Sequence, residues 1–237
     1  MFLKQFYSDR GNKILIDPEQ ASLFAKEIAG DFNPLHDSEA KRFCVPGDLL
    51  FALVLEKYGL SQEMSFTFSG MVGRGVLLNF PQLQSDAFDI SDDNGRTYLR
   101  VERSGPNVAD KSLIEPFIRN YVAFSGPNFP HVLVPLMERH NVMINTERPL
   151  VIYEKMAFEF DHLNFSEPKL EGTDTRLDVN GKRGTALLHF AVNAGNATVG
   201  IGYKKLVISG MREYDHDAIQ AFIENYLAGM ERYKAAM

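Results

Sequence analysis

The chain has 237 residues, with 25 Lys and Arg against 31 Asp and Glu, which gives a formal net charge of −6 at pH 7. Hydrophobic residues make up 45% and charged residues 24%, a balance typical of a folded globular protein and unlike that of a disordered chain. The acidic excess argues against non-specific nucleic-acid binding, because neutralising phosphates requires a basic surface. The length allows one large domain or two small ones.

The sequence also predicts where the protein resides. Cys44 is the only cysteine, so neither an intrachain disulfide nor a cysteine-based zinc site can form. The first ten residues carry charges at positions 4, 9 and 10 and lack the apolar stretch of a signal peptide. No apolar run approaches the roughly 18 residues of a membrane span. We therefore expect a cytoplasmic protein with no metal and no membrane span.

The first elements lead to a polar loop. A short strand is expected over 13–16, and Asp17 followed by Pro18 is typical of the start of a helix. Apolar residues at helical spacing predict that this helix continues until Gly30. The polar segment 31–36 follows it.

A second helix is predicted from Pro46-Gly47-Asp48 to about Tyr58. It is apolar on nearly every side, which indicates burial on most sides. Alternating segments then predict strands over 64–70, 76–80, 87–91 and 96–103, with an Asn-Gly turn before the last. The turn-rich segment 104–110 is predicted to be a linker.

The second half repeats this order. Helices are predicted over 113–124 and 132–140, and a charged helix over about 214–235 closes the chain. Between them, strands are predicted over 150–160, 173–179, 185–192 and 198–208.

Two pairs of segments indicate an internal duplication. Ala29-Gly-Asp-Phe-Asn-Pro-Leu-His36 is similar to Phe124-Ser-Gly-Pro-Asn-Phe-Pro-His131, and the two histidines are 95 positions apart. Met64-Ser-Phe-Thr-Phe68 is similar to Met156-Ala-Phe-Glu-Phe160, at an offset of 92. We therefore predict an α+β fold in which each half wraps an antiparallel sheet around one long helix. The predicted boundaries are 1–109 and 110–212 for the two lobes and 213–237 for the terminal helix.

The segment Ala29-Gly-Asp-Phe-Asn-Pro-Leu-His36 resembles the hydratase motif of the MaoC-like (R)-specific enoyl-CoA hydratases, almost letter for letter. Ser65-Phe-Thr-Phe-Ser-Gly-Met-Val-Gly73 is similar to a strand pattern of the same family. That family has the hotdog fold, so the resemblance implies a divergent double hotdog. It also implies hydration or dehydration of an enoyl thioester.

The resemblance assigns roles to four residues. Asp31 and His36 would hold one water between them and share the acid and base roles as it adds across the double bond. Asn33 would orient the loop or the water. The Gly47 N–H, at a helix N-terminus, would stabilise negative charge on the thioester oxygen.

The same resemblance suggests substrate contacts. Phe66 and Phe68 would line an acyl tunnel, and Arg74 could meet the phosphates of coenzyme A. The ligand would be a small acyl thioester, with coenzyme A as part of the substrate and no other cofactor. The protein would be a monomer of two lobes or a homodimer.

The sequence departs from the family at several positions. Pro46 replaces a histidine, and Asp48 replaces an apolar residue where its charge would oppose the oxyanion unless the side chain points away. In the second half Pro127 stands where Asp31 would align, so that lobe, which keeps Asn128 and His131, is predicted to be non-catalytic. These departures keep open a non-enzymatic module that binds an acyl-CoA, another lipid-like ligand or a protein partner. A thioesterase is a third alternative, and Asp31 and His36 could also form only a capped turn.

Overall fold

The N-terminal half carries most of its strands after one long helix. The computed structural model describes residues 2–82 and 85–235. Helix α1 (Pro18–Leu23) continues as a π-helix (Phe24–Ala29), a 3₁₀ turn spans Pro34–His36, and α2 spans Gly47–Tyr58. A 3₁₀ helix (Phe2–Phe6) precedes the strands, which are β1 (Ser8–Arg10), β2 (Lys13–Leu15), β3 (Leu60–Phe68), β4 (Leu77–Asn79), β5 (Ala87–Ser91) and β6 (Thr97–Val108).

The C-terminal half has three helices before its long strands and one after them. The helices are α3 (Lys111–Ser125), α4 (Asn128–His131), α5 (Leu133–Arg139) and α6 (His216–Ala235). The strands are β7 (Val142–Met143), β8 (Val151–Phe160), β9 (Lys169–Asn180), β10 (Arg183–Ala194), β11 (Ala197–Ser209) and β12 (Arg212–Glu213).

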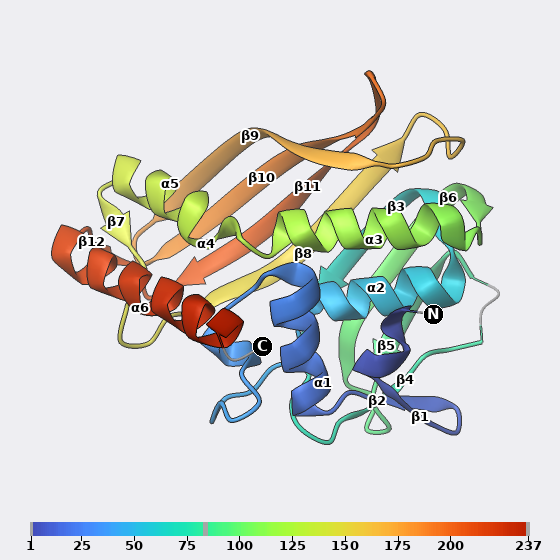
Figure 1. Cartoon of the computed structure of the whole chain (residues 1–237), viewed down its shortest axis with the longest axis horizontal. Coiled ribbons are helices and arrows are strands. Elements are labelled where there is room, and N and C mark those ends of the chain that lie inside the picture. The colour runs from blue at the N-terminus through green and yellow to red at the C-terminus, as the bar shows by residue number, and fades with distance from the viewer. Residues whose placement is uncertain (1, 83–84, 236–237) are drawn as a thin grey trace.

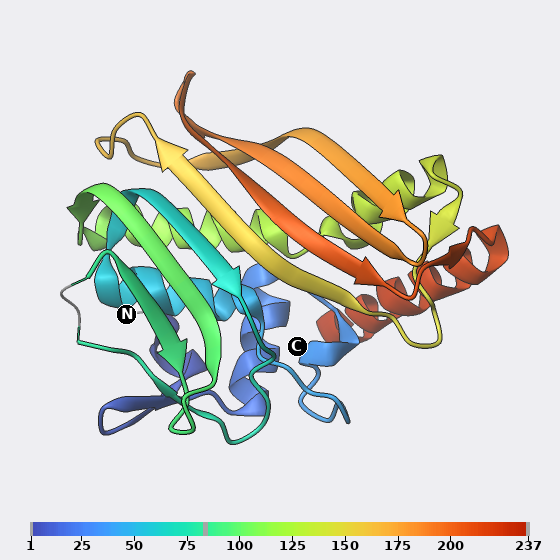
Figure 2. The ribbon, with the colours of Figure 1, turned by 180° about the vertical axis from the view of Figure 1, so that it is seen from behind.

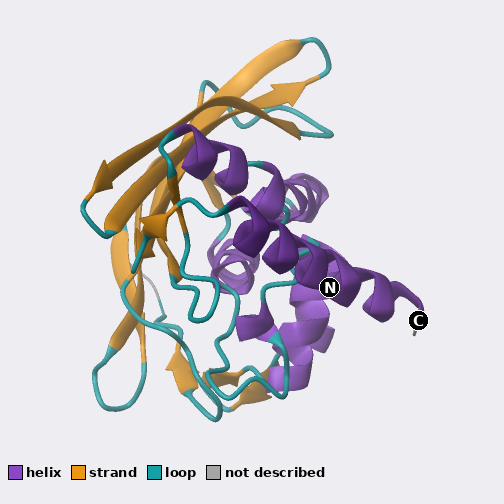
Figure 3. Ribbon diagram, turned by 90° about the vertical axis from the view of Figure 1, so that its left-hand side faces the viewer, coloured by secondary structure: helices purple, strands orange, loops and turns teal. Residues whose placement is uncertain are grey.

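Ten of these strands form one curved antiparallel sheet with the helices on its concave side (Figures 1 and 3). The order is β1-β2-β4-β5-β6-β3-β8-β11-β10-β9, and β7 pairs separately with β12. The long helices α2 and α3 contact each other beneath the sheet. This arrangement confirms the predicted α+β double hotdog. No helix in the described ranges is long and apolar enough to cross a membrane.

Strands β3 and β8 join the two halves at the middle of the sheet (Figure 2). Met64 pairs with Phe158, and Phe66 pairs with Met156. The sequence repeat matches Met64 with Met156 and Phe66 with Phe158, so exchanging the halves converts each of these pairs into the other. The register therefore has the two-fold relation that a duplicated segment would give.

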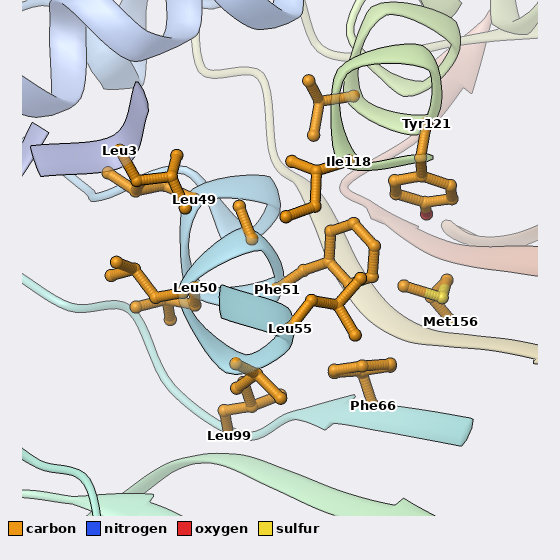
Figure 4. Packing of buried hydrophobic residues seen from close by; sticks show 14 of the residues in the cluster. Leu3, Leu49, Leu50, Phe51, Leu55, Phe66, Leu99, Ile118, Tyr121 and Met156 are labelled. Atoms are coloured by element: carbon orange, nitrogen blue, oxygen red, sulfur yellow. The ribbon is translucent and has the colours of Figure 1, made fainter. Parts of the chain in front are cut away.

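The core is continuous across this junction. Phe51 of α2 is fully buried, and its ring centroid lies 5.2 Å from that of Phe66 and 4.6 Å from that of Tyr121 on α3 (Figure 4). All residues of α2 from Asp48 to Leu55 are buried, as its all-round apolar sequence predicts. Burial of each such apolar side chain contributes about 1.5–3 kcal/mol of transfer free energy.

The predicted linker 104–110 is wrong over most of its length. Strand β6 continues to Val108, with Ser104 opposite Glu63 and a bulge in this stretch, where Gly105 has φ +74°. Strand β5 pairs with β6 as far as Glu102. Beyond Arg103, the side of β6 that faced β5 is therefore a sheet edge. An edge strand tolerates proline, because the missing N–H removes no hydrogen bond on the side that has no neighbouring strand. This turn-rich sequence can therefore form part of a strand.

Candidate active site

The loop that carries the motif is fixed by local hydrogen bonds. The preceding π-helix ends at Gly30, whose φ is +63°, and the Asp31 N–H donates to Ala25 O at 2.8 Å. Asp31 Oδ1 accepts the Asn33 N–H at 2.9 Å, and Asn33 Oδ1 accepts the Leu35 N–H at 3.1 Å. These two successive Asx turns hold the loop in one conformation.

The loop places the Asp31 carboxylate against the His36 ring. His36 Nδ1 lies 2.7 Å from Cys44 O, and because a carbonyl only accepts, Nδ1 carries a proton. The other ring nitrogen, Nε2, lies 3.5 Å from Asp31 Oδ2. Both side chains are largely buried, with 12% of His36 and 24% of Asp31 exposed.

The two groups shift each other's protonation. Burial by itself would lower the pKa of His36, but the facing Asp31 carboxylate and the Cys44 carbonyl raise that pKa above its ordinary value. Burial would raise the pKa of Asp31, but His36 and the Asn33 N–H hold it below its ordinary value. Each group therefore stabilises the charged form of the other.

A cavity of about 470 Å³ opens beside this pair. Its volume lies within the range of about 300–1,000 Å³ that is usual for small-molecule sites. Both halves line it: Asp31, His36 and Gly47 come from the first half, and Ser125 and Lys204 come from the second. Most of the remaining wall is apolar, and Phe222 and Tyr226 of α6 form part of it.

The N-terminus of α2 lies at the cavity and carries N–H groups that its own helix does not use. The N–H groups of Leu49 and Leu50 both donate to Pro46 O, at 3.1 and 3.4 Å. The N–H groups of Gly47 and Asp48 precede them and have no intrahelical acceptor. They lie at the positive end of the helix dipole, where negative charge is stabilised.

Gly47 packs closely against two aromatic rings. A Cβ at this position would lie 3.1 Å from the Phe68 ring and 3.1 Å from the Tyr153 ring. With a larger residue here, both rings would have to move by a few tenths of an ångström.

The Asp48 side chain lies inside the protein and lines the cavity. The residue is 6% exposed, and Oδ1 has no hydrogen-bond partner within residues 2–82 and 85–235. Burial raises the pKa of this carboxyl, while Lys204 and the Ser125 hydroxyl act in the opposite direction. The side chain is therefore not turned out of the protein, which is the orientation that would have removed its charge from the oxyanion position.

Lys204 of β11 is a cavity residue that the sequence reasoning missed. It is 7% exposed, and its Nζ donates to Ser125 O at 3.3 Å and to Ser125 Oγ. The Nζ also lies 4.2 Å from the centroid of the Tyr153 ring, and burial lowers its pKa. Strand alternation could have identified it, because Leu206 and Ile208 face the core and every second residue shares a face.

The two halves hold cations at matching positions of the sheet. Arg103 pairs with Met64, and Lys204 pairs with the matching residue, Met156. Arg103 donates to Tyr58 O, in the last residue of α2, at 3.1 Å, as Lys204 donates to the last residue of α3. A cation at a helix C-terminus is stabilising, so Lys204 has a packing role as well as its place in the cavity.

The structure brings together some of the predicted site residues and not others. Asp31, Asn33, His36, Gly47 and Phe68 all line the cavity. Asn33 orients the loop through its cap to Leu35.

Two predicted substrate residues lie elsewhere, and the second half's histidine is exposed. Phe66 lies two residues before Phe68 in β3. It is fully buried and is not part of the cavity lining. Arg74 is exposed, donates to Ser38 O and Ala40 O, and is not part of the lining either. His131 is exposed.

Asn128, the other motif residue kept in the second half, lines the cavity, and its Nδ2 donates to Ser125 O at 2.7 Å. In the described part of the chain, no cluster of three or more His, Cys, Asp and Glu residues is arranged to hold a metal ion.

A family model described as "Protein of unknown function (DUF3581)" matches residues 1–217. The chain belongs to the DUF3581 family. The DUF3581 match includes the cavity residues of both halves, whereas Phe222 and Tyr226 of α6 lie beyond it. No curated protein matches the chain in sequence. The likeness to the MaoC-like hydratases therefore stays a resemblance of motif.

Three solved structures are similar to this DUF3581 chain over most of its length. An acyl-CoA thioesterase II from Mycobacterium marinum is 10% identical, with 91% of this chain and 99% of that chain covered and a TM-score of 0.40. A conserved protein of unknown function with a hot dog fold from Alicyclobacillus acidocaldarius is 10% identical, with coverages of 88% and 98% and a TM-score of 0.48. A protein described as an oleoyl thioesterase from Lactobacillus plantarum is 6% identical, with coverages of 86% and 93% and a TM-score of 0.38.

Proposed function

We propose that the protein adds water to, or removes water from, an acyl thioester, with Asp31 and His36 as the acid–base pair. The observation that carries this proposal is the 3.5 Å separation of His36 Nε2 and Asp31 Oδ2 at the wall of a 470 Å³ cavity. Because Nδ1 is held by the Cys44 carbonyl, Nε2 is the nitrogen that can exchange a proton.

The protonation states assign the roles in hydration. The Asp31 carboxylate accepts a proton from water as the water oxygen bonds to the β-carbon of the enoyl group. The His36 imidazolium donates its Nε2 proton to the α-carbon, and the carbon–carbon π bond breaks. The negative charge that develops on the thioester oxygen is stabilised by the Gly47 N–H. A proton then passes from Asp31 to His36, and the pair returns to its starting state.

The same steps in reverse eliminate water from a 3-hydroxyacyl thioester. The apolar walls of the cavity suit an acyl chain, since burying apolar surface supplies binding free energy without requiring polar partners. One lobe supplies the acid–base pair, because Pro127 occupies the position in the second half that corresponds to Asp31.

A second candidate is binding of an acyl thioester without turnover. The buried Asp48 carboxyl beside the Gly47 N–H favours it, because an ionised carboxylate there would oppose charge on the thioester oxygen. This candidate predicts acyl-CoA binding that Asp31→Asn leaves unchanged, and no turnover.

The test follows the loss of the conjugated enoyl-thioester absorbance with crotonyl-CoA and longer homologues. Wild-type protein is expected to consume the absorbance without releasing a free thiol, and Asp31→Asn is expected to lose the activity. Asp37→Asn is the matched control, because Asp37 lies on the same loop, pairs with Lys26 at 2.7 Å and is not part of the cavity lining. An unchanged rate in Asp31→Asn would contradict the proposal, and release of free thiol would indicate a thioesterase instead.

A further inference from the structure

One charged side chain of the cavity lining is open to solvent. Among the described lining residues, Arg96, directly before β6, is the charged residue that is exposed. The other charged or titratable His, Asp and Lys residues of the lining are buried or half-buried, namely Asp31, His36, Asp48 and Lys204. Arg96 is therefore the charged group that a ligand in the cavity would meet where it leaves the protein.

Two exposed apolar side chains line the same cavity. Met71 is 39% exposed and Ile152 is 41% exposed. Large apolar side chains are mostly buried, and exposed ones that gather beside polar groups are typical of a ligand-binding groove. We call Met71, Arg96 and Ile152 the mouth of the cavity. Its chemistry suits a ligand whose partly apolar arm ends in an anion.

The Arg96 guanidinium is held in place by packing. Its Cζ lies 5.1 Å from the centroid of the Tyr98 ring. A Cβ at Gly70, another lining residue, would lie 3.3 Å from Arg96 Nη2 and 3.4 Å from Nε. The Ser69 N–H donates to Tyr98 O at 2.9 Å, which keeps this segment beside β6. A guanidinium that stacks on a ring still presents its N–H groups in its own plane.

These N–H groups are free of a protein acceptor in the described structure. Within residues 2–82 and 85–235, the Arg96 guanidinium forms neither an ion pair nor a hydrogen bond. The carboxylate of Asp92 is already used, because Oδ1 accepts the backbone N–H groups of Asn94 and Arg96 and Oδ2 accepts the Tyr98 O–H. An arginine with unused donors is suited to a phosphate, which its planar fork can bind through two hydrogen bonds.

We propose that Arg96 binds the phosphate at the end of the pantetheine arm of coenzyme A, while Met71 and Ile152 contact the arm. The proposal rests on the proposed function, because it requires an acyl thioester in this cavity, and it names coenzyme A as the carrier. It gives Arg96 the phosphate contact that the sequence predicted for Arg74. Arg74 lies outside the lining, and its guanidinium donates to backbone carbonyls.

The test measures binding of two ligands that differ only in that phosphate. S-butyryl-phosphopantetheine carries it, and S-butyrylpantetheine does not. Neither contains a double bond, so the readout does not depend on hydration. In calorimetric titrations, wild-type protein is expected to bind the phosphorylated ligand about tenfold or more tightly, the effect of one hydrogen bond to a charged group. Butyryl-CoA is expected to bind at least as tightly as S-butyryl-phosphopantetheine.

Substitutions separate the guanidinium from the rest of the mouth. Arg96→Met keeps an apolar stem without the charge. It is expected to reduce the affinity for S-butyryl-phosphopantetheine about tenfold and to leave the affinity for S-butyrylpantetheine unchanged. Arg96→Lys keeps the charge without the planar fork and is expected to retain part of the preference for the phosphate. Thermal unfolding checks that both variants are folded.

Arg74→Met is the matched control. Arg74 is also exposed and also stacks on an aromatic ring, with its Cζ 5.2 Å from the centroid of the Phe43 ring. Its donors are occupied by Ser38 O and Ala40 O, and it is not part of the lining. Arg74→Met is therefore expected to bind all three ligands as wild type does.

The outcomes distinguish this inference from the function on which it rests. A phosphate preference that is lost in Arg96→Met and kept in Arg74→Met would support the proposal. An unchanged preference in Arg96→Met, or an equal loss of affinity for both pantetheine ligands, would overturn the role of Arg96 and leave the proposed function standing. Weaker binding of butyryl-CoA than of S-butyryl-phosphopantetheine would overturn coenzyme A as the carrier. Absence of binding of all three ligands and their longer homologues by folded wild-type protein would contradict the thioester function, and the role of Arg96 would be overturned with it.

Discussion

Gly126→Ala is expected to destabilise the protein by about 4 kcal/mol or more, a loss that only a severe local conflict produces. A Cβ at Gly126 would lie 1.8 Å from Ala29 O and 2.7 Å from Ala29 C. It would also lie 3.2 Å from Asp31 N, so the substitution would displace the loop that carries the acid–base pair. We therefore expect hydration activity to fall together with stability.

Helix propensity alone predicts the opposite sign. Gly126 has φ −63° and ψ −51°, a conformation that alanine adopts readily. Without the contact to Ala29, the substitution would stabilise the helix end by up to about 1 kcal/mol. Gly229 of α6 is the matched control, because the nearest atom to a Cβ there is the end of the Arg232 side chain at 3.9 Å.

Urea unfolding of both variants is the measurement. Gly229→Ala should be as stable as wild type or more stable, and Gly126→Ala should unfold at a much lower midpoint with an unchanged slope. A Gly126→Ala protein of wild-type stability would show that the close contact between the end of α3 and the motif loop is wrong.

The elements near the site could be predicted because their signals are local. Gly30 ends the first helix with φ +63°, and Gly59 follows the end of α2 with φ +83°. The Asp31 and Asn33 side chains each bond within two residues of themselves. Such signals need no knowledge of the rest of the fold, so the sequence alone is sufficient to place Asp31 and His36 on one ordered loop.

The composition of the cavity could not be predicted in the same way. Lys204 enters it from a strand 168 positions after His36, and only the assembled sheet shows that it faces Ser125. Phe66 and Phe68 share one face of β3, but Phe68 lies beside Gly47 whereas Phe66 is covered by Phe51. Sequence periodicity predicts which face of a strand a residue occupies, but not whether the residue lies at the cavity or in the core.

The protonation of His36 is expected to depend on Asp31. The facing carboxylate raises the pKa of His36 above 6.5, and His36 in turn helps to hold the pKa of Asp31 below 3.8. Hydration requires an ionised Asp31 and a protonated His36. The rate should therefore be highest between the lowered pKa of Asp31 and the raised pKa of His36, fall as the pH rises through the latter, and fall as the pH drops through the former.

Asp31→Asn should change both the rate and this titration. We expect a loss of about 10³-fold in kcat/KM, within the usual contribution of a general acid or base. The pKa of His36 should also fall, because burial would then lower it without an opposing carboxylate.

The stability that the raised His36 pKa contributes to the wild-type protein is present below about pH 6.5 and is lost as the pH rises through the folded-state pKa. In Asp31→Asn this pH dependence should weaken or reverse in sign, because the pKa of His36 falls.

An NMR titration of the His36 ring measures this pKa without any substrate, so it tests the pair even if the physiological thioester is unknown. Asp37→Asn should leave the His36 titration unchanged, because Asp37 pairs with Lys26 and is not among the groups that shift the pKa of His36. If Asp31→Asn also leaves it unchanged, the two residues are not electrostatically coupled. The loop would then be a capped turn with a buried histidine, and the hydratase mechanism would lose its acid–base pair.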